Sequence, residues 1–452
     1  MAASNNVAAT KIRKTFYMTG NEREAMSHRE DGANGDVEPH ERTGLLNRIA
    51  TTDSGTPYYK HENRVIRYPF LVGHITTEVL KTNYVNVLLV FVPIGILSGL
   101  LHWAPTLQFI FNFIAIIPLA SLLAFATEEL AIPLGQTIGG LLNATFGNAV
   151  ELIVSIIALR NNQIRIVQAS MLGSILSNIL LVLGCCFFIG GIRYREQTFN
   201  STVASTMSSL MTVATSSLII PATLYAVMSD SKAQDDNIMV LSRGTSIILL
   251  LIYVAYLYFQ LKSHADLFDD AEAQEDDNPE DQLLGPWSAG IVLVIITLLV
   301  AWCAEYLVDS IDAIVEEAHI SKTFIGLILI PIVGNAAEHV TAVIVAWKNK
   351  MDLAIGVAIG SSLQIAIFVT PFLVILGWIM DRPMTLHFET FETVSFFLAS
   401  LVVVLLIQDG KSNYLEGLLC LGMYIIIALA FYVLPEDAGS GLNPGKLFSG
   451  GN

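Results

Sequence analysis

Charged residues are scarce in this 452-residue sequence. Asp, Glu, Lys and Arg make up 14% of the chain, whereas 53% of its residues are hydrophobic. A soluble globular domain carries about 25% charged residues. The strict alternation of apolar and polar residues that builds membrane β-barrels is also absent. These absences exclude an ordinary soluble domain and a barrel, and they leave a helical membrane protein.

Several functional signatures are missing as well. All four cysteines lie in apolar segments, so no disulfide framework is indicated. The sequence Asp409-Gly-Lys-Ser412 lacks the glycine that a phosphate-binding loop needs five residues before its Gly-Lys-Ser. There is no His-Glu-x-x-His, which argues against an intramembrane metalloprotease. The composition, with a net charge of -16, does not favour nucleic acid as a partner. We therefore expect no cofactor and no ATP, and any transport would be driven by an ion gradient.

Long apolar runs recur along the chain instead. About 20 apolar residues cross a hydrocarbon core of about 30 Å as a helix. The sequence therefore predicts an all-α polytopic membrane protein with about 11 transmembrane helices. The predicted spans are residues 84–103, 107–127, 137–159, 168–190, 205–227, 237–260, 287–308, 323–347, 353–378, 390–407 and 414–434.

Polar segments flank and divide these spans. Residues 1–83 read as a largely disordered tail. This tail holds 11 of the 24 Lys and Arg residues. Lys60, Arg64, Arg67 and Lys81 lie just before the first span and favour a cytosolic N-terminus, although the later loops split their basic residues evenly between the two sides. Residues 263–284 form an acidic cytosolic linker, and 435–452 a short tail. Eleven spans would put that C-terminal tail on the lumenal side.

A short motif reveals an internal repeat. Gly-Asn-Ala occurs at residues 147–149 and again at 334–336, each time with a glutamate close behind, and a shift of 187 residues superposes the two copies. Residues 104–262 and 285–434 therefore form two five-helix repeats, and 84–103 is an extra helix. Because five is odd, the second repeat enters the membrane from the opposite side. Inverted repeats of this kind are common in secondary transporters.

Each copy of the motif places one carboxylate where the bilayer would be. Glu151 and Glu338 follow their glycines by four residues, and no Lys or Arg lies within their segments. A carboxylate in hydrocarbon is costly enough to indicate a functional site. Two carboxylates, with carbonyl and amide oxygens from a broken helix, suit a hard cation such as Ca²⁺, which takes six to eight oxygen ligands. The residues expected to break the helices and supply these oxygens are Gly147, Asn148, Gly334 and Asn335.

The fourth and ninth predicted spans, 168–190 and 353–378, contain further side-chain oxygen atoms. Ser174 and Ser177 are three residues apart, as are Ser361 and Gln364, so each pair shares a helix face. Helix packing with interhelical hydrogen bonds would also explain these residues. The offset of 187 residues that they share with the glutamates favours a place in the lining of the site.

Further acidic residues lie at the ends of the second and seventh predicted spans, 107–127 and 287–308. Glu128 and Glu129 are adjacent, whereas Glu305 and Asp309 are four residues apart on one helix face. They could be outer ligands, carboxylates of a proton path or residues at the membrane surface. His339 follows Glu338 and so points elsewhere on the helix, where it could titrate, tune selectivity or simply be packed.

At this point the sequence resembles a known family. The stretch from Pro133 to Ile153, which contains Asn-Ala-Thr-Phe-Gly-Asn-Ala-Val-Glu, resembles the first α-repeat of the CAX family of Ca²⁺/H⁺ antiporters. Residues 334–364 resemble the second α-repeat. The resemblance covers residues 84–434, acidic linker included, and is strongest to the fungal vacuolar exchangers.

The resemblance implies roles for particular residues. Glu151 and Glu338 would bind the cation and exchange protons. Glu128, Glu305 and Asp309 would lie along the cytosolic access path. The serines and glutamine of segments four and nine would line the site, and the histidine after the second glutamate would bear on the choice between Ca²⁺ and Mn²⁺. The acidic linker would recruit or sense Ca²⁺, and the membrane would be that of the vacuole.

A mechanism follows from the charges. Burial disfavours an ionised carboxylate, and a bound Ca²⁺ reverses that preference and drives protons off. Cytosolic Ca²⁺, or Mn²⁺, would then exchange for protons from an acidic compartment by alternating access. The open alternatives are a Na⁺- or K⁺-coupled exchanger and a cation channel. One acid from each half fits an exchanger better than the ring of acids that lines a channel.

Overall fold

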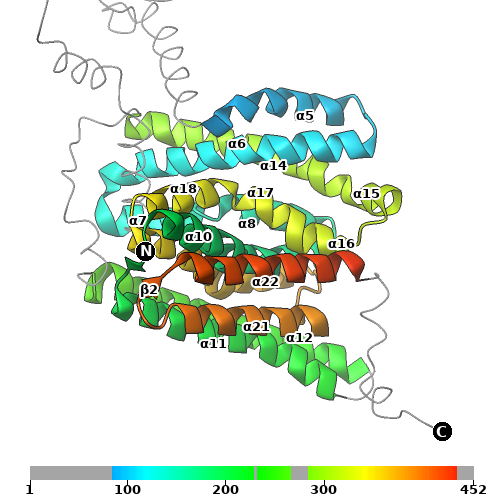
Figure 1. Cartoon of the computed structure of the whole chain (residues 1–452). Coiled ribbons are helices and arrows are strands. Elements are labelled where there is room, and N and C mark those ends of the chain that lie inside the picture. Colours follow the sequence, from blue (N-terminus) through cyan, green and yellow to red (C-terminus); the bar gives the residue numbers. More distant parts are fainter. Residues whose placement is uncertain (1–83, 229–231, 266–283, 435–452) are drawn as a thin grey trace, which may run out of the picture. The chain divides into compact units, whose positions relative to one another are not determined.

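Helices account for nearly all of the structure. The computed structural model describes residues 84–228, 232–265 and 284–434 (Figure 1). The predictions for the N-terminal tail, for most of the acidic linker and for the C-terminal tail lie outside these described residues. The described chain from Leu88 onward belongs to a single compact unit, so the two repeats are not separate domains.

The elements follow one another with short connections. The α-helices are α5 (Phe91–Leu100), α6 (Pro105–Ala131), α7 (Gly135–Phe146), α8 (Ala149–Arg160), α9 (Ile164–Leu176), α10 (Leu183–Arg193), α11 (Ser201–Val227), α12 (Lys232–Tyr258), α14 (Pro286–Asp309), α15 (Ile311–Ala318), α16 (Lys322–Phe324), α17 (Ile330–Gly334), α18 (Ala336–Trp347), α19 (Met351–Gln364), α20 (Thr370–Ile379), α21 (Thr390–Leu406) and α22 (Tyr414–Val433). Two 3₁₀ segments are η2 (Tyr84–Val90) and η3 (Ile132–Leu134). Four π-helical segments are η4 (Ser177–Val182), η5 (Phe259–Ser263), η7 (Ile325–Leu329) and η8 (Ile365–Val369). The two strands are β1 (Gln197–Thr198) and β2 (Lys411–Ser412).

Local sequence sets several helix boundaries. Pro105 and Pro286 lie in the first turns of α6 and α14. Proline fits there because its fixed φ is helical and its missing N–H would have no intrahelical partner. A capping box of Asn413 and Glu416 begins α22, so two backbone N–H groups at this helix start find side-chain acceptors.

The lengths and composition of the helices fit a membrane protein. Seven described helices are long and apolar enough to span a bilayer, and two bent pairs, α7 with α8 and α16–α17 with α18, raise the number to nine. The apolar helices Val85–Leu100 and Thr390–Leu406 are shorter than these. The prediction of an all-α polytopic membrane protein is therefore confirmed, whereas a count of eleven spans requires both shorter helices.

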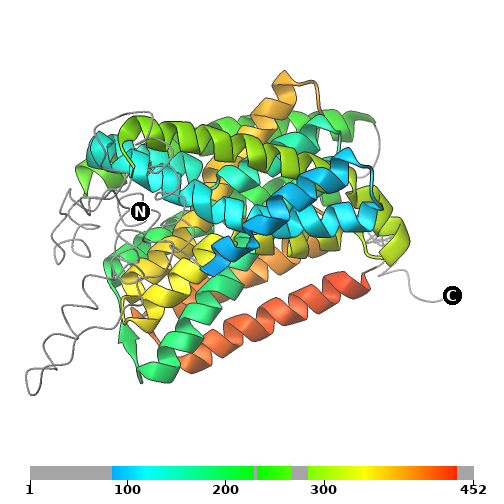
Figure 2. The same cartoon turned by 90° about the horizontal axis from the view of Figure 1, so that it is seen from above.

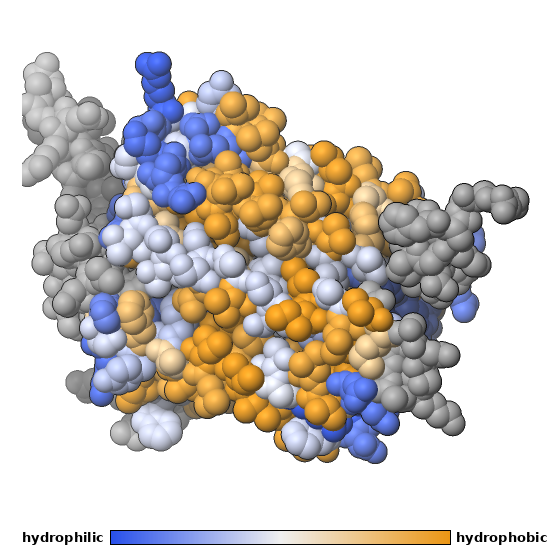
Figure 3. Space-filling view, turned by 90° about the horizontal axis from the view of Figure 1, so that it is seen from below, coloured by the Kyte–Doolittle hydropathy of each residue, from blue (hydrophilic) through white to orange (hydrophobic). Residues whose placement is uncertain are grey.

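Two spans form the centre of the molecule. In an apolar stretch of 18 residues taken from each span, 72% of the residues are buried in Ile164–Arg193 and 78% in Met351–Ile379. The same share is 28% in Asp236–Ser263 and in Tyr414–Val433. The outer helices therefore carry apolar side chains on their exposed faces. Figure 3 shows a broad apolar area on one face, with hydrophilic side chains gathered at its two ends. This is the surface expected of a protein surrounded by lipid.

Helices α6 and α14 run alongside each other in opposite directions. Figures 1 and 2 both show α5 on the outer side of this pair. The backbone N–H of Leu284, just before α14, donates to Oε2 of Glu129 near the end of α6, at 2.8 Å. The end of α6 therefore lies beside the start of α14. Because Leu284 is the last residue of the acidic linker, the linker joins α14 at the Glu128–Glu129 end of α6.

The two halves approach each other most closely where glycine allows it. A side chain on Gly173 of α9 would collide with the carbonyl oxygen of Leu327 in η7. Glycine lets two helix backbones approach at this point without a side chain between them. The close contact holds the central helix of the first half against the helix that leads to Gly334 in the second half.

Candidate cation site between two helix breaks

Both glutamates begin a helix immediately after a break in the chain. Helices α7 and α8 are bent by 47°, and Asn148 between them has φ -106° and ψ 27°. The second pair is bent by 57° at Asn335, which has φ -85° and ψ 3°. Glu151 lies in the first turn of α8 and Glu338 in the first turn of α18. Negative charge is favoured at this position, since the N–H groups of the first turn point toward it.

The first break is held by the central helix of the opposite half. The Asn148 side-chain amide donates to Oε1 of Gln364 at 2.7 Å, and the Ser361 hydroxyl donates to Oδ1 of Asn148 at 2.9 Å. All three residues are buried. The structure therefore brings these three predicted site residues together, and the hydrogen bonds of the Asn148 side chain connect the two halves.

The second break is held in a similar way by the first half. The Asn335 side-chain amide donates to the backbone carbonyl of Ser174 at 3.2 Å. The Asn178 amide, one turn after Ser174, donates to Oε2 of Glu338 at 3.4 Å. Each broken helix therefore contacts the central helix of the other half, and a movement of one half would change the surroundings of both glutamates.

The two carboxylates lie near the same point. Glu338 is close enough to Glu151 for their charges to interact. A Cβ atom added to Gly334 would lie 2.7 Å from Oε1 of Glu151, so the Glu151 carboxylate rests against the break of the second half. Among the described residues no ion pair joins either glutamate to a Lys or Arg. The two acids therefore have no structural counter-ion in the described part of the chain.

Oxygen atoms beside the carboxylates remain available to a cation. Oδ1 of Asn178 and Oδ1 of Asn335 are buried, and neither has a hydrogen-bond partner in the structure. An unpaired buried oxygen costs free energy, and a bound cation can supply its partner. Carboxylate and amide oxygens are the hard ligands that Ca²⁺ prefers. No cluster of three or more His, Cys, Asp or Glu side chains is found in the described ranges.

A pocket leads to Glu338 from the Glu128 end of α6. Its polar lining consists of Thr127, Glu128, Asn143, Glu338 and Thr341. Gly147 and Gly334 also line it, so it reaches both helix breaks. Glu128 and Glu338 therefore line one pocket, which lies toward the end of α6 that contacts Leu284.

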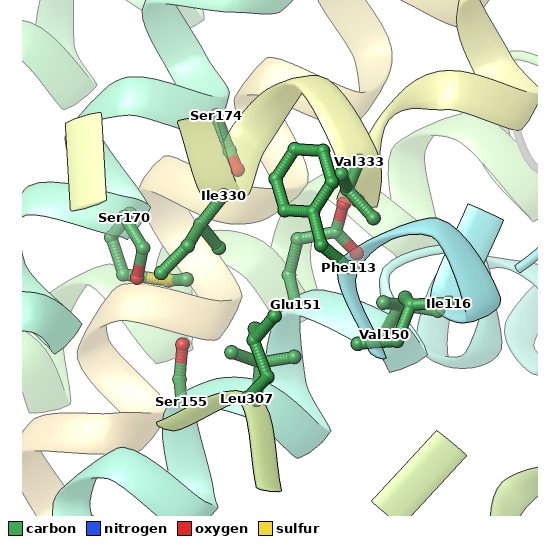
Figure 4. Close-up of a pocket in the computed structure, with 13 residues that line it drawn as sticks. Phe113, Ile116, Val150, Glu151, Ser155, Ser170, Ser174, Leu307, Ile330 and Val333 are labelled. Atoms are coloured by element: carbon green, nitrogen blue, oxygen red, sulfur yellow. The ribbon is translucent and has the colours of Figure 1, made fainter. Parts of the chain in front are cut away.

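A second pocket reaches Glu151 from the opposite direction. Figure 4 shows Glu151 in this pocket with Ser155, Ser170 and Ser174 on its walls. The rest of its lining is apolar and includes Phe113 of α6. The two pockets share Val150 and Gly334, and they therefore meet at the site from two sides.

The structure does not bring Glu305 and Asp309 together with Glu128. They lie at the far end of α14, where Arg160 pairs with Glu305 at 2.5 Å and the Asn161 amide donates to Asp309 at 2.7 Å. The expected cytosolic access path grouped these acids with Glu128. In the antiparallel pair of α6 and α14 they lie at opposite ends, so Glu305 and Asp309 belong to the other side of the site.

Three further residues take no part in the contacts between the broken helices and the central helices. Ser177 is buried one turn after Ser174 beside the hydroxyl of Tyr424, and it lines neither pocket. His339 also lines neither pocket, and it is only partly buried. Glu129 is buried against Leu284, as described above, and serves the packing of α6 on α14.

Sequence reasoning missed Asn178 as a partner of Glu338. The residue that corresponds to it at the shift of 187 is Ile365, so a search for repeated polar residues passes over it. Its position four residues after Ser174 was the available signal, since that spacing puts both side chains on one helix face.

Fold and site together define a helical membrane protein in which two broken helices bring one carboxylate each to the same region between the two halves. The chain belongs to the sodium/calcium exchanger protein family, whose model matches residues 104–262 and 288–433. The resemblance to the antiporters of the CAX family is confirmed by the relatives described next.

Relatives of known name match most of the chain. It is 49% identical over 398 residues to a vacuolar calcium ion transporter of Schizosaccharomyces pombe, which covers 88% of this chain and 94% of the relative. It is 44% identical over 365 residues to a Ca²⁺/H⁺ antiporter of Aphanothece halophytica, with 77% and 97% covered. The solved structure of native YfkE is similar with a TM-score of 0.67 and 41% identity, over 77% of this chain and 100% of that one.

Proposed function

We propose that this protein exchanges Ca²⁺ for protons across a membrane by alternating access. The observation that carries the proposal is the meeting of Glu151 and Glu338, one from each half, without a basic partner among the described residues. Relatives named as vacuolar calcium transporters and Ca²⁺/H⁺ antiporters support this function. Mn²⁺ is a second candidate substrate, because it also takes oxygen ligands.

The geometry gives a physical basis for the coupling. A carboxylate that coordinates Ca²⁺ must be deprotonated, so a cation and protons compete for Glu151 and Glu338. The competition favours Ca²⁺ on the side with few protons and releases it on the acidic side. The two pockets supply one approach from each side. Because each break is bonded to the central helix of the other half, a rocking of the halves would open one pocket as it closes the other.

The arrangement of loops supports two inverted five-helix repeats and eleven crossings. On one side, β1 pairs with β2, and the backbone N–H of Asn200 donates to Asp352 at 2.6 Å. On the other side Arg160 pairs with Glu305. All of these contacts join loops that an alternating path of eleven helices places on the same side. We further propose that the Glu128 side is cytosolic, that the C-terminal tail is lumenal, and that the membrane is vacuolar, as the names of the relatives indicate.

Transport in liposomes tests the function. The full-length protein is reconstituted into vesicles with an acidic interior, and uptake of ⁴⁵Ca²⁺ is measured with and without the pH gradient. Uptake should require the gradient, and Glu151→Gln should reduce it to the level of vesicles without protein. Glu129→Gln is the matched control, because it also removes a buried carboxylate from the membrane but keeps an oxygen to accept from Leu284. Full gradient-driven uptake by Glu151→Gln would refute the proposal.

The same vesicles distinguish the sodium-coupled alternative. The proton gradient is collapsed, and an outward Na⁺ or K⁺ gradient is imposed in its place. We expect no Ca²⁺ uptake under these conditions, because in the proposed mechanism the ions exchanged for Ca²⁺ are the protons of Glu151 and Glu338. Uptake driven by Na⁺ would instead show that the protein exchanges Ca²⁺ for sodium, the activity in the name of its family.

A further inference from the structure

The pocket beside Glu151 contains hydroxyl groups that no step described so far requires. Ser155 lies four residues after Glu151 on α8, and Ser170 lies four residues before Ser174 on α9. Residues four apart share a helix face. The four side chains therefore form two short columns on facing helices, and all four line the same pocket (Figure 4).

Ser155 is the unusual member of this group. The residue is 1% exposed, and its Oγ has no hydrogen-bond partner in the structure. A buried hydroxyl without a partner is costly. The Ser170 hydroxyl donates to the carbonyl of Val167 at 3.1 Å and keeps its lone pairs free to accept. Both groups therefore have capacity for a further hydrogen bond inside a pocket whose remaining lining is apolar.

The position of the pocket indicates which side it serves. Helix α8 runs from Glu151 past Ser155 to Arg160, and Arg160 pairs with Glu305. Leu307 of α14 also lines the pocket. The hydroxyls thus lie between Glu151 and the end of the molecule that carries Glu305. The pocket lies away from the Glu128 route, which reaches the site beside Glu338.

The composition of the pocket favours protons over Ca²⁺. Ca²⁺ takes six to eight oxygens, and the side chains of the pocket supply oxygen atoms from only one carboxylate and three hydroxyls. Water needs only two to four polar partners, and a site with several hydroxyls can provide them. Glu151 is the only titratable side chain in the lining, so it is the group to which a proton would pass.

From these observations we infer that Ser155 and Ser170 form a water-binding proton relay that connects Glu151 to the Glu305 side of the protein. Along the relay each water or hydroxyl oxygen accepts one proton and passes on another. One proton is thereby added to a Glu151 oxygen, and no other group changes its protonation. The relay would let protons reach Glu151 while the pocket is closed to Ca²⁺, and Ca²⁺ would leave on this side only after the rocking of the halves has opened the pocket. This inference rests on the proposed Ca²⁺/H⁺ exchange.

Two transport modes separate the relay from a packing role. The first is ⁴⁵Ca²⁺ uptake driven by a pH gradient, and the second is exchange of ⁴⁵Ca²⁺ for unlabelled Ca²⁺ at equal pH, which moves no protons. Ser155→Ala combined with Ser170→Ala should slow the gradient-driven mode by about tenfold. It should leave the Ca²⁺/Ca²⁺ mode within about twofold of the wild type.

Matched variants control for the loss of a buried hydroxyl. Ser246→Ala removes a fully buried hydroxyl that likewise has no partner, and Ser98→Ala removes one that donates to a carbonyl three residues earlier, as Ser170 does. Neither residue lines the pocket, and both variants should transport normally in both modes. Ser155→Thr keeps a hydroxyl and should retain gradient-driven uptake, which keeps the test valid if the double variant does not fold.

The possible results lead to different conclusions. An equal loss in both modes would show that the serines serve packing or a general ion route, and it would overturn the relay. Unchanged rates in both modes would overturn it as well. If the wild type exchanges Ca²⁺ for Ca²⁺ but shows no gradient-driven uptake, then the proposed proton coupling itself is wrong, and this result is distinguishable from a failure of the relay alone.

Discussion

At the scale of single residues, the site depends on how closely Gly334 lies to Glu151. An alanine at this position would place its Cβ 2.7 Å from Oε1 of Glu151. The displaced atom is the end of a flexible side chain, so we expect little loss of fold stability. The carboxylate must nevertheless move away from the site, and disturbing the surroundings of a metal ligand weakens metal affinity by about 10–100-fold. Gly334→Ala should therefore weaken Ca²⁺ binding by roughly ten- to a hundredfold, measured by titration calorimetry on the purified protein.

Gly422 provides the matched control for this substitution. It lies within α22, and a Cβ there would meet nothing within 4 Å. Gly422→Ala should bind Ca²⁺ as the wild type does. An affinity of Gly334→Ala equal to that of Gly422→Ala would show that the Glu151 carboxylate takes no part in binding.

Single residues also mark how far the site could be predicted. Glu151, Glu338, Asn148 and their glycines were visible because the same short motif occurs twice. The contacts of Asn148 with the opposite half were not, since its partners Ser361 and Gln364 lie more than 200 residues away in sequence. A repeat search finds only what both halves share. It therefore misses Ser155, whose counterpart at the shift of 187 is Ala342.

At the scale of elements, two ion pairs fix helix ends and differ in their surroundings. Arg165 at the start of α9 pairs with Glu392 in the first turn of α21 at 2.7 Å, and the Glu392 side chain is fully buried. Glu392 also accepts from the backbone N–H of Glu389 and so caps α21. Arg165 also pairs with Glu389 at 3.0 Å, so the loss of Glu392 does not leave the guanidinium without a partner. The loss does remove the cap and a hydrogen bond between charged groups, which contributes about 1.5–3 kcal/mol. Glu392→Ala should therefore lower the free energy of unfolding by about 2 kcal/mol, seen as a lower Tm in nanodiscs.

The exposed pair of Arg160 and Glu305 should behave differently. Its side chains are 56% and 44% exposed, and such pairs contribute about 0–1 kcal/mol. Arg160→Ala should therefore change Tm far less than Glu392→Ala does in the same assay. An equal loss of stability in the two variants would contradict the distinction drawn here between a buried and an exposed pair.

The elements themselves were largely predictable, because apolar runs of helical length set their extent. The two bends fall at the Gly-Asn pairs where the motif predicts a break. The pairing of α9 with α21 could not be foreseen, since Arg165 and Glu392 are 227 residues apart and neither belongs to the repeated motif. The π-helical segments η4 and η8, which directly follow α9 and α19, also have no evident signal in the local sequence.

At the scale of the whole molecule, a bound cation should hold the two halves together. Each glutamate contacts the opposite half, so Ca²⁺ at the site would stabilise the folded protein. A ligand at 100 times its Kd stabilises by about 2.7 kcal/mol. Ca²⁺ should therefore raise Tm at neutral pH, and the rise should shrink near pH 5 because protons then occupy the carboxylates.

Variants of the site test this thermal effect. Glu151→Gln and Glu338→Gln should each reduce the Ca²⁺-dependent rise in Tm, whereas Glu129→Gln should keep it. Scanning fluorimetry of the purified protein in nanodiscs gives the measurement. A rise that persists in both site variants, or that is the same near pH 5 as at neutral pH, would place the stabilising Ca²⁺ elsewhere in the chain.

Orientation in the membrane is the property that the loops define least. Their basic residues divide evenly, and only the N-terminal segment, with 11 of the 24 Lys and Arg residues, gives a direction. The contacts between loops show which of them share a side but not which side is cytosolic.

If the basic segment governs insertion, an epitope at the N-terminus of the full chain should be digested by protease added to sealed, cytosol-side-out vesicles. An epitope at the C-terminus should be digested only after detergent is added, because an odd number of crossings separates the two ends. Asn200, in the sequence Asn-Ser-Thr, should remain unglycosylated because it lies on the side of β1 and β2, which this orientation makes cytosolic. Digestion of both epitopes without detergent would require an even number of crossings and would contradict the count of eleven. Two five-helix repeats without a crossing at 84–103 would give ten crossings, and Glu151 and Glu338 would still come to the site from opposite directions.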